Sequence, residues 1–412
     1  MIGRTNAVSK PGVELSLVVS VTSGAAVTAT KGTKSVTGTA ASGSCTLSLP
    51  EAGTWSVKAT LNGQTSDTKS VSVVDSYAVA LTFFSATITV NVDSGASVVL
   101  KKGSTTIATK TSTGTAVFTV TETGTYTVEA TKSGQTVSGS VNVVSGTTSY
   151  ALTLSFVSST LNDNTWDVIR AVSDAGTASS YWSIGDRHAE PMSGTVGLLS
   201  LNLTTYVFIV DFDHNKSKES PSAHTITFQF GKSALSGGSD IAFYDSKYGP
   251  DSSWATGSGF VMNTSNTNSG GWKSSYMRNT LMPQFKAACS SLLRSNVKTV
   301  SIYSDNTGGG SDTASYVTAT SDDFYLASEF EIHGARSYAN GAEKNYQTQL
   351  AYYAAGNSKI KYKYNSTGTA VIVWCRSVYA CYSGRFCLVN TDGAANLYSA
   401  YSSLALAPLF NI

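Results

Sequence analysis

The densest group of metal-ligand side chains in this sequence is the run D-F-D-H-N, which contains Asp211, Asp213, His214 and Asn215. Side chains alternate along a strand, so Asp211 and Asp213 would share one face if the preceding strand continued through the run. Two carboxylates on one face suit a hard cation such as calcium. Turns at strand ends use the same residue types to cap their own backbone. We favour the turn, and we predict no metal and no cofactor.

A second group could in principle carry acid–base chemistry. In S-E-F-E-I-H, an extended strand would place Glu329, Glu331 and His333 on one face, where a carboxylate and an imidazole could act as general acid and base. The alternative is a strand edge with alternating polar groups, and we favour it. His188 and His224 stand apart from other candidate groups. We therefore predict that the chain is not an enzyme.

The cysteines do not form a recognisable site. Their number is five, and Cys375, Cys381 and Cys387 are evenly spaced without a histidine cluster beside them. An odd number does not describe a disulfide framework, and zinc sites need four suitable ligands. We expect reduced, partly buried thiols.

The region from residue 373 to 412 alternates two kinds of residue. Trp374 and Phe410 are expected in the core. Together with Arg376 and Ser377 they form a set of scaffold residues, called the frame below. Tyrosine and polar residues between them supply rigid contact area at low entropic cost. Small polar neighbours disfavour a core role for these tyrosines. We predict a binding surface made of Tyr379, Tyr382, Arg385, Leu388, Asn390, Asp392, Asn396, Tyr398 and Tyr401.

The helices and strands that must position these residues are predicted from the periodicity of apolar residues and from glycine and proline, which end such elements. We expect a helix from Trp166 that ends near Gly176, and antiparallel strands before Asn215 and after His224. Further on we expect two helical pieces broken at Pro283, a strand over 297–304, and a helix over 342–353. Residues 158–412 therefore read as an α+β domain.

The first 157 residues contain an internal repeat. The sequence E-A-G-T-W-S-V-K-A-T-L-N-G-Q-T begins at Glu51, and E-T-G-T-Y-T-V-E-A-T-K-S-G-Q-T begins 71 residues later at Glu122. Alternating apolar residues flank the turn dipeptides Asn62-Gly63 and Ser133-Gly134, which predicts hairpins. Two small Greek-key sandwiches over 1–85 and 86–157 are the expected outcome.

Composition excludes several classes of protein. The chain has 412 residues, enough for two to four domains, and only 13% charged residues, about half the usual share. A net charge of +2 without basic clusters argues against nucleic acid as a partner. No apolar run is long enough to cross a membrane, and the N-terminal residues lack the apolar segment of a signal peptide.

Three motifs carry a family resemblance: Y-W-S-I-G-D from Tyr181, the block S-N-T-N-S-G-G-W-x-x-S-x-M-R that ends at Arg278, and W-x-R-S…G…A-P-x-F from Trp374. Residues 158–412 resemble the C-type-lectin-like domain of prophage and surface proteins of gut Firmicutes, which is similar to the variable proteins of diversity-generating retroelements. The repeats resemble the immunoglobulin-like spacers of phage and bacterial surface proteins. The expected fold is mainly β, with two tandem immunoglobulin-like β-sandwich repeats followed by an α+β C-type-lectin-like domain.

This resemblance implies a phage tail or fibre adhesin whose C-terminal variable surface, 373–412, binds a host-surface glycan or protein. The repeats would contact other virion proteins, and the chain would be assembled in the host cytoplasm without membrane insertion. A virion decoration protein without a specific ligand is the alternative, and a glycan-processing enzyme is a weaker one. The sequence leaves the oligomeric state open, and a homo-oligomer is compatible with it.

Overall fold

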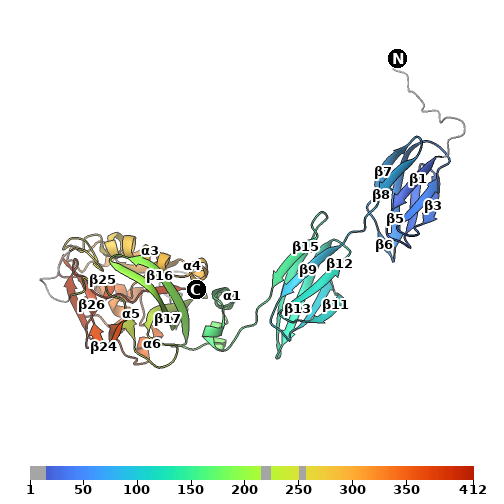
Figure 1. Ribbon diagram of the computed structural model, residues 1–412. Helices are drawn as coiled ribbons and strands as arrows, with labels where there is room; N and C mark the ends of the chain where they lie inside the picture. The colour runs from blue at the N-terminus through green and yellow to red at the C-terminus, as the bar shows by residue number, and fades with distance from the viewer. Residues whose placement is uncertain (1–14, 215–223, 250–256) are drawn as a thin grey trace, which may run out of the picture. The chain divides into compact units, whose positions relative to one another are not determined.

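The computed structural model describes residues 15–214, 224–249 and 257–412 and is mainly β (Figure 1). The chain divides into two units, Met1–Phe156 and Val157–Ile412, and each is considered by itself. Within the described residues, no helix is both long and apolar enough to traverse a lipid bilayer.

The first repeat folds as a sandwich of two sheets around one core. One sheet has the order β4-β1-β8, and in the other β3, β2 and β5 follow one another while β6 and β7 both pair with β5. The core includes Leu17, Val27 and Trp55, all fully buried. The strands are β1 (Ser16–Ser20), β2 (Ala26–Lys31), β3 (Lys34–Thr39), β4 (Ser44–Ser48), β5 (Gly53–Leu61), β6 (Gln64–Thr65), β7 (Lys69–Val73) and β8 (Tyr77–Ala80).

The second repeat reproduces this sandwich with its strands shifted by about the repeat length. Its sheets have the orders β12-β9-β15 and β11-β10-β13-β14, and the last strand pairs in parallel with the first, as in the first copy. The strands are β9 (Ala86–Asn91), β10 (Ser97–Lys102), β11 (Thr105–Thr111), β12 (Thr115–Val120), β13 (Gly124–Lys132), β14 (Gln135–Val143) and β15 (Ser149–Thr153).

Two details explain why the repeated residues keep the same roles. The Trp55 indole donates a hydrogen bond to the carbonyl of Glu51 (3.2 Å), and the Tyr126 hydroxyl donates to the equivalent carbonyl of Glu122 (2.9 Å). The ring of each residue is thus buried while its one polar atom keeps a hydrogen-bond partner. Both hairpin turns have positive φ at their two central residues, 50° and 81° at Asn62-Gly63, which confirms the predicted tight turns.

The second unit is built on a five-stranded sheet with the order β16-β17-β18-β28-β22. The C-terminal strand lies inside this sheet, and the chain ends beside α1, where the Ser173 hydroxyl donates to the carbonyl of Ile412 (2.6 Å; Figure 1). The strands are β16 (Arg187–Val196), β17 (Leu199–Phe212), β18 (Ile226–Lys232), β22 (Phe324–Tyr325) and β28 (Leu409–Asn411).

Smaller sheets and short helices surround the large sheet. The sheets are β19 (Ile241–Ala242), β23 (Lys361–Lys363) and β24 (Ser366–Val371); β20 (Val300–Asp305) and β21 (Val317–Asp322); and β25 (Val373–Val378), β26 (Arg385–Val389) and β27 (Ala395–Ser399). The α-helices are α1 (Trp166–Asp174), α2 (Gly271–Ser274), α3 (Met282–Ala288), α4 (Ser291–Asn296), α5 (Glu329–His333) and α6 (Ala351–Ala354). Short 3-10 turns cover Leu161–Asp163, Ala178–Ser180, Ala314–Tyr316 and Gly341–Asn345, and Met277–Leu281 is a π-helical turn.

Several predicted elements are confirmed and others are wrong. The helix from Trp166 and the antiparallel pair β17 and β18 are present. Pro283 does not break a helix, because α3 continues directly from the π-helical turn Met277–Leu281 and Pro283 lies near the start of α3. The break falls instead at Cys289. The predicted helix over 342–353 is a 3-10 turn and the separate short helix α6.

Phe410 on β28 is the centre of an aromatic cluster in the core of the second unit. Its ring stacks on Phe228 (centroids 5.3 Å apart) and Phe324 (5.4 Å), and it is fully buried. The prediction that Phe410 and Trp374 belong to the core is confirmed, since Trp374 is 2% exposed.

We predict that Phe410→Ala destabilises this unit by about 3–5 kcal/mol, because it leaves a cavity between stacked rings. In differential scanning calorimetry the transition of the 157–412 unit should shift to lower temperature. Leu292→Ala is the matched control, since Leu292 is 53% exposed. Equal shifts for the two variants would contradict this packing.

Candidate ligand-binding surface

The predicted surface maps onto the three-stranded antiparallel sheet β25-β26-β27 and its loops. β25 is buried along its whole length, and it carries the frame residues Trp374, Arg376 and Ser377. The Trp374 indole donates to the carbonyl of Phe260 (2.9 Å). The frame therefore lies under the surface, whereas the loops around it reach solvent.

Arg376 and Ser377 connect β25 to the surrounding elements. The Arg376 guanidinium donates to both carboxylate oxygens of Glu331 on α5 (2.5 and 2.7 Å) and to the Ser304 hydroxyl on β20 (2.9 Å). The Ser377 hydroxyl donates to Glu343 (2.7 Å), which is also fully buried. A bidentate pair of this kind fixes geometry as well as charge.

Glu331 is shared between two cations. Besides Arg376 it meets the imidazole of His214 (3.5 Å), whose other ring nitrogen lies 2.8 Å from Asp211. Burial alone would lower the pKa of His214, but the hydrogen bonds to Asp211 and Glu331 outweigh burial and raise the pKa to about 10. Burial likewise raises the pKa of Glu331, yet Arg376 and His214 bring it down to about 2. The four groups form a buried network of two cations and two anions.

Tyr382 and Arg385 are the most accessible of the predicted aromatic and basic residues. Tyr382 is 53% exposed, and the Arg385 guanidinium lies over its ring, 5.4 Å from the centroid. Cys381 and Ser383 beside them are exposed as well. This pairing holds two long side chains together on the surface by a cation–π contact.

The other tyrosines are half-buried. The ring of Tyr379 packs edge-to-face on Tyr338, with centroids 5.9 Å apart. Tyr398 pairs with Phe386 across the hairpin and packs against the core. Tyr401 is also half-buried. Each therefore offers only part of its ring to a ligand.

The polar members of the predicted set lie towards the far end of the β26–β27 hairpin. Asn390 and Asp392 belong to its turn, in which the Asp392 carboxylate accepts from the amide of Ala394 (3.0 Å). Asn396 is exposed on β27. The structure thus places the predicted residues in two groups, one at each end of β26.

The prediction for Leu388 is wrong. It is 1% exposed and belongs to the hydrophobic core, opposite Asn396 on β27. β26 is the central strand of its sheet, and Phe386, Cys387, Leu388 and Val389 are all buried, so both faces of the strand are covered. A continuous apolar run is the sequence pattern of such a strand.

Asn268 holds the loop 379–385 and was not singled out from the sequence. Its side-chain amide donates to the carbonyls of Tyr379, Tyr382 and Arg385 at 3.3, 2.9 and 3.1 Å, and its backbone amide donates to Ser383 (2.7 Å). Asn268 is fully buried. All four contacts reach main-chain carbonyls, so they do not depend on which side chains the loop carries. Its place in the S-N-T-N-S-G-G-W block was the available signal.

In the run D-F-D-H-N, Asp211 and Phe212 end β17, Asp213 and His214 follow it, and both aspartates accept hydrogen bonds from backbone amides. Asp211 accepts from the amide of Ala351 (3.1 Å) as well as from His214, and Asp213 accepts from the amide of Thr225 (2.9 Å). Asn215 lies outside the described residues. Among the residues that are described, no group of three or more His, Cys, Asp or Glu side chains is arranged to hold a metal ion.

The segment with Glu329, Glu331 and His333 is helix α5, so the predicted strand is wrong. Ser328 and Glu331 form a capping box, and Gly334 ends the helix with φ 70°. Glu329 accepts from three successive backbone amides, 337 to 339, at 2.8–3.0 Å. Both carboxylates are therefore buried in structural contacts, which leaves them inaccessible to a substrate.

The five cysteines are free, and all but Cys381 are buried. Burial raises the pKa of the Cys375 and Cys387 thiols well above the ordinary value, so these thiols stay protonated and unreactive.

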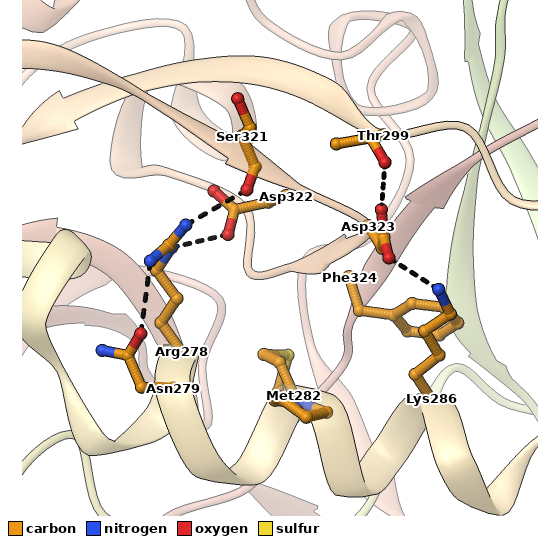
Figure 2. A pocket seen from close by; sticks show the side chains of 10 residues that line it. Arg278, Asn279, Met282, Lys286, Thr299, Ser321, Asp322, Asp323 and Phe324 are labelled. Atoms are coloured by element: carbon orange, nitrogen blue, oxygen red, sulfur yellow. Dashed lines mark hydrogen bonds and ion pairs between the residues drawn. The ribbon is translucent and has the colours of Figure 1, made fainter.

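A cleft of about 450 Å³ lies elsewhere on this unit, beside the π-helical turn and α3 (Figure 2). Arg278 bonds Asp322 (2.6 Å) at one end and Lys286 bonds Asp323 (2.6 Å) at the other, with Met282 between them. The charged groups of this cleft thus neutralise one another. π-helical turns are frequent at functional sites. Here the turn carries Arg278, which pairs with Asp322, whereas Lys286 lies on α3.

A family model described as "Domain of unknown function (DUF6273)" matches residues 257–412. This segment includes Asn268, α5 and the sheet β25-β26-β27. No curated protein matches the chain.

Two solved structures show weak similarity. The Bacillus anthracis TIE protein is 10% identical with a TM-score of 0.19, and the match covers 53% of this chain and 45% of that one. The family 26 carbohydrate-binding module CBMbc of Eubacterium rectale Amy13K, solved with maltoheptaose, is 14% identical with a TM-score of 0.14, and the match covers 34% of this chain and 92% of the module. This chain therefore spans less than half of the Bacillus anthracis protein, and neither likeness carries an argument about fold or function.

We predict that Asn268→Ala loosens the 379–385 loop, because up to three main-chain carbonyls lose their donor at a buried site. A cost of about 2–3 kcal/mol is expected for buried groups left unsatisfied. Hydrogen–deuterium exchange should become faster in and around residues 379–385. Asn396→Ala, which removes an exposed amide, is the control. Unchanged exchange in Asn268→Ala would contradict the role of this side chain.

A pH dependence follows from His214. Its folded pKa of about 10 exceeds the ordinary 6.5, so its contribution to stability is complete below about pH 6.5 and is lost as the pH rises towards 10. The difference in melting temperature between the native chain and His214→Gln should therefore shrink over this range.

His333→Gln is the control for this experiment. Burial lowers the pKa of His333 to about 4, so this side chain is neutral in both the folded and unfolded states above about pH 7.5. The effect of His333→Gln should not change between about pH 7.5 and 10. A constant gap for His214→Gln would show that His214 is not charged in the folded protein.

Proposed function

We propose that this chain is a receptor-binding protein of a phage particle. In this proposal residues 158–412 form a C-type-lectin-like domain that binds a host-surface glycan or protein, and the two sandwiches are immunoglobulin-like spacers that join it to other virion proteins.

The observation that carries the proposal is the separation of frame from surface in the last forty residues. Trp374, Arg376, Ser377 and Phe410 are buried and bonded to other elements, whereas Tyr382 and Arg385 stand on a loop held by main-chain contacts. A buried frame under exposed tyrosine and arginine is the arrangement that a recognition surface requires, because ordered contact groups lose little entropy on binding.

The chemistry of the surface fits a ligand that is contacted by stacking and hydrogen bonds. Tyrosine and arginine are enriched among the residues that dominate binding energy. Asp392 and Asn396 add exposed acceptors and donors at the other end of the hairpin. No charge of one sign dominates these four residues, so a polyanionic partner is not favoured.

The half-burial of Tyr379, Tyr398 and Tyr401 favours the second candidate, a virion decoration protein without a specific ligand. These rings add less accessible aromatic area than the sequence predicts. The two candidates differ in one observable property, which is binding to cells.

We predict that the double variant Tyr382→Ala, Arg385→Ala binds host cells at least 10-fold more weakly, since a hot-spot residue contributes about 2 kcal/mol. Its melting temperature should stay within about 2 °C of the native chain, because both side chains are exposed. The measurement is flow cytometry of the labelled full-length chain on a panel of gut Firmicutes strains.

Tyr181→Ala is the control, because Tyr181 is a 38% exposed tyrosine outside this surface. It should leave cell binding unchanged. Native chain that binds no strain would favour the decoration protein, and binding that survives the double variant would place the receptor contact elsewhere.

A further inference from the structure

A second cleft, of about 610 Å³, lies in the 157–412 unit between three segments that are distant in sequence: 159–163, 185–187 and 235–237. None of these residues belongs to the sheet β25-β26-β27 or its loops. The cleft is within the volume range of small-ligand sites. Its lining is mostly polar and includes three planar side chains that are bonded to the backbone, those of Asn162, Asp186 and Arg187.

Each planar side chain is anchored to the backbone through one end. The Asn162 Oδ1 atom accepts from the amide of Ala189 (2.8 Å), and one Asp186 carboxylate oxygen accepts from the amide of Ser183 (2.8 Å). The Arg187 Nη1 atom donates to two carbonyls of the 234–237 loop, at 2.5 and 2.6 Å. These bonds fix the orientation of the side chains before any ligand arrives.

The other end of each side chain has no partner among the described residues. These are the Nδ2 atom of Asn162, the second carboxylate oxygen of Asp186, and the Nε and Nη2 atoms of Arg187. Asp163, at the same cleft, is exposed and makes only a long contact of 3.5 Å with Ser158. The cleft therefore combines preorganised side chains with unused donors and acceptors.

The cleft of Figure 2 has a comparable volume and the opposite chemistry. There Arg278 and Lys286 are each paired with an aspartate, so their charges are neutralised by groups of the protein itself. In the second cleft the anchors are backbone groups instead, and no ion pair involving Asp163, Asp186 or Arg187 is found among the described residues. This difference makes the second cleft a better candidate for ligand binding than the cleft of Figure 2.

We propose that this second cleft binds a neutral sugar unit of a glycan. Vicinal hydroxyl groups both donate and accept, and anchored amide, carboxylate and guanidinium groups present matching atoms in fixed planes. Leu235, which is 42% exposed, adds an apolar contact for the C–H face of a ring. Two carboxylates against one guanidinium exclude acidic sugars by like-charge repulsion.

This site goes beyond the receptor-binding surface and does not depend on it. Because the two lie on different elements, a glycan chain or two separate glycans could engage both, and the second contact would add avidity. The receptor of the C-terminal surface can differ from the sugar held here.

The test is saturation-transfer difference NMR on the full-length chain. The probes are glucose, galactose, N-acetylglucosamine and rhamnose, with glucuronate and N-acetylneuraminate as acidic probes, all in the presence of EDTA. We expect at least one neutral sugar to receive saturation and neither acidic sugar to do so. No signal from any neutral sugar, or a signal that requires added calcium, would overturn the proposal.

Two variants change the free end of an anchored side chain and keep its anchor. Asn162→Asp retains the acceptor for the Ala189 amide but replaces a donor by an acceptor, and Asp186→Asn does the reverse beside the Ser183 amide. Each should weaken sugar binding at least 10-fold without a change in melting temperature. Leu235→Ser, at an exposed position, provides a third variant that cannot disturb the core.

Two controls separate this site from the rest of the molecule. Lys286→Gln changes the cleft of Figure 2 and should leave the sugar signal unchanged. The double variant Tyr382→Ala, Arg385→Ala should also keep the signal, so failure of the receptor-binding proposal and failure of this one are distinguishable. Folded variants of the second cleft that bind sugar like the native chain would overturn the assignment.

Discussion

The second unit depends on the buried pair of Arg376 and Glu331. Both side chains are fully buried, and the carboxylate is shared with His214. Such a pair adds little net stability, because desolvation offsets the attraction, but removal of one partner leaves an uncompensated buried charge. The pair therefore specifies which elements meet: β25, helix α5 and the end of β17.

The position of the exposed loop between β25 and β26 depends on this buried pair. β25 is held by the ion pair of Arg376 with Glu331 and by the hydrogen bond of the Trp374 indole. β26 is covered on both faces, and β27 is an edge strand of this three-stranded sheet. The loop between β25 and β26 is held through its carbonyls by Asn268. The exposed side chains of Tyr382 and Arg385 can therefore change without loss of these main-chain contacts, whereas Tyr379 packs on Tyr338.

Local patterns in the sequence were sufficient for the repeats. Their strands alternate strictly, and the Asn62-Gly63 turn needs positive φ, so each feature is encoded within a few residues. The core positions of Trp374 and Phe410 were also predicted from the sequence, and their burial confirms this prediction. The class of the fold, mainly β, followed from these features.

Other features depend on partners far away in sequence. The Glu329–His333 segment alternates like a strand, which outweighed the local capping signal of Ser328 and Glu331. The ion pair of Glu331 with Arg376, by contrast, is visible only in the fold. Leu388 was assigned to the surface although it stands in a continuous apolar run, and the elements that cover both faces of β26 are visible only in the fold. Asn268 stands in the S-N-T-N-S-G-G-W block, but its role could not be read from that block, since its partners are more than a hundred residues away.

The central claim is that the C-terminal loops, and not the sandwiches, contact the host. Hydroxyl-radical footprinting of the full-length chain, with and without envelopes of a strain that it binds, tests this claim directly. The account predicts that envelopes protect Tyr382 and its neighbours in 379–401 from oxidation and leave exposed residues of the sandwiches, such as Tyr77, unchanged. Protection confined to residues 15–156, with Tyr382 oxidised as fast as in the absence of envelopes, would contradict this claim.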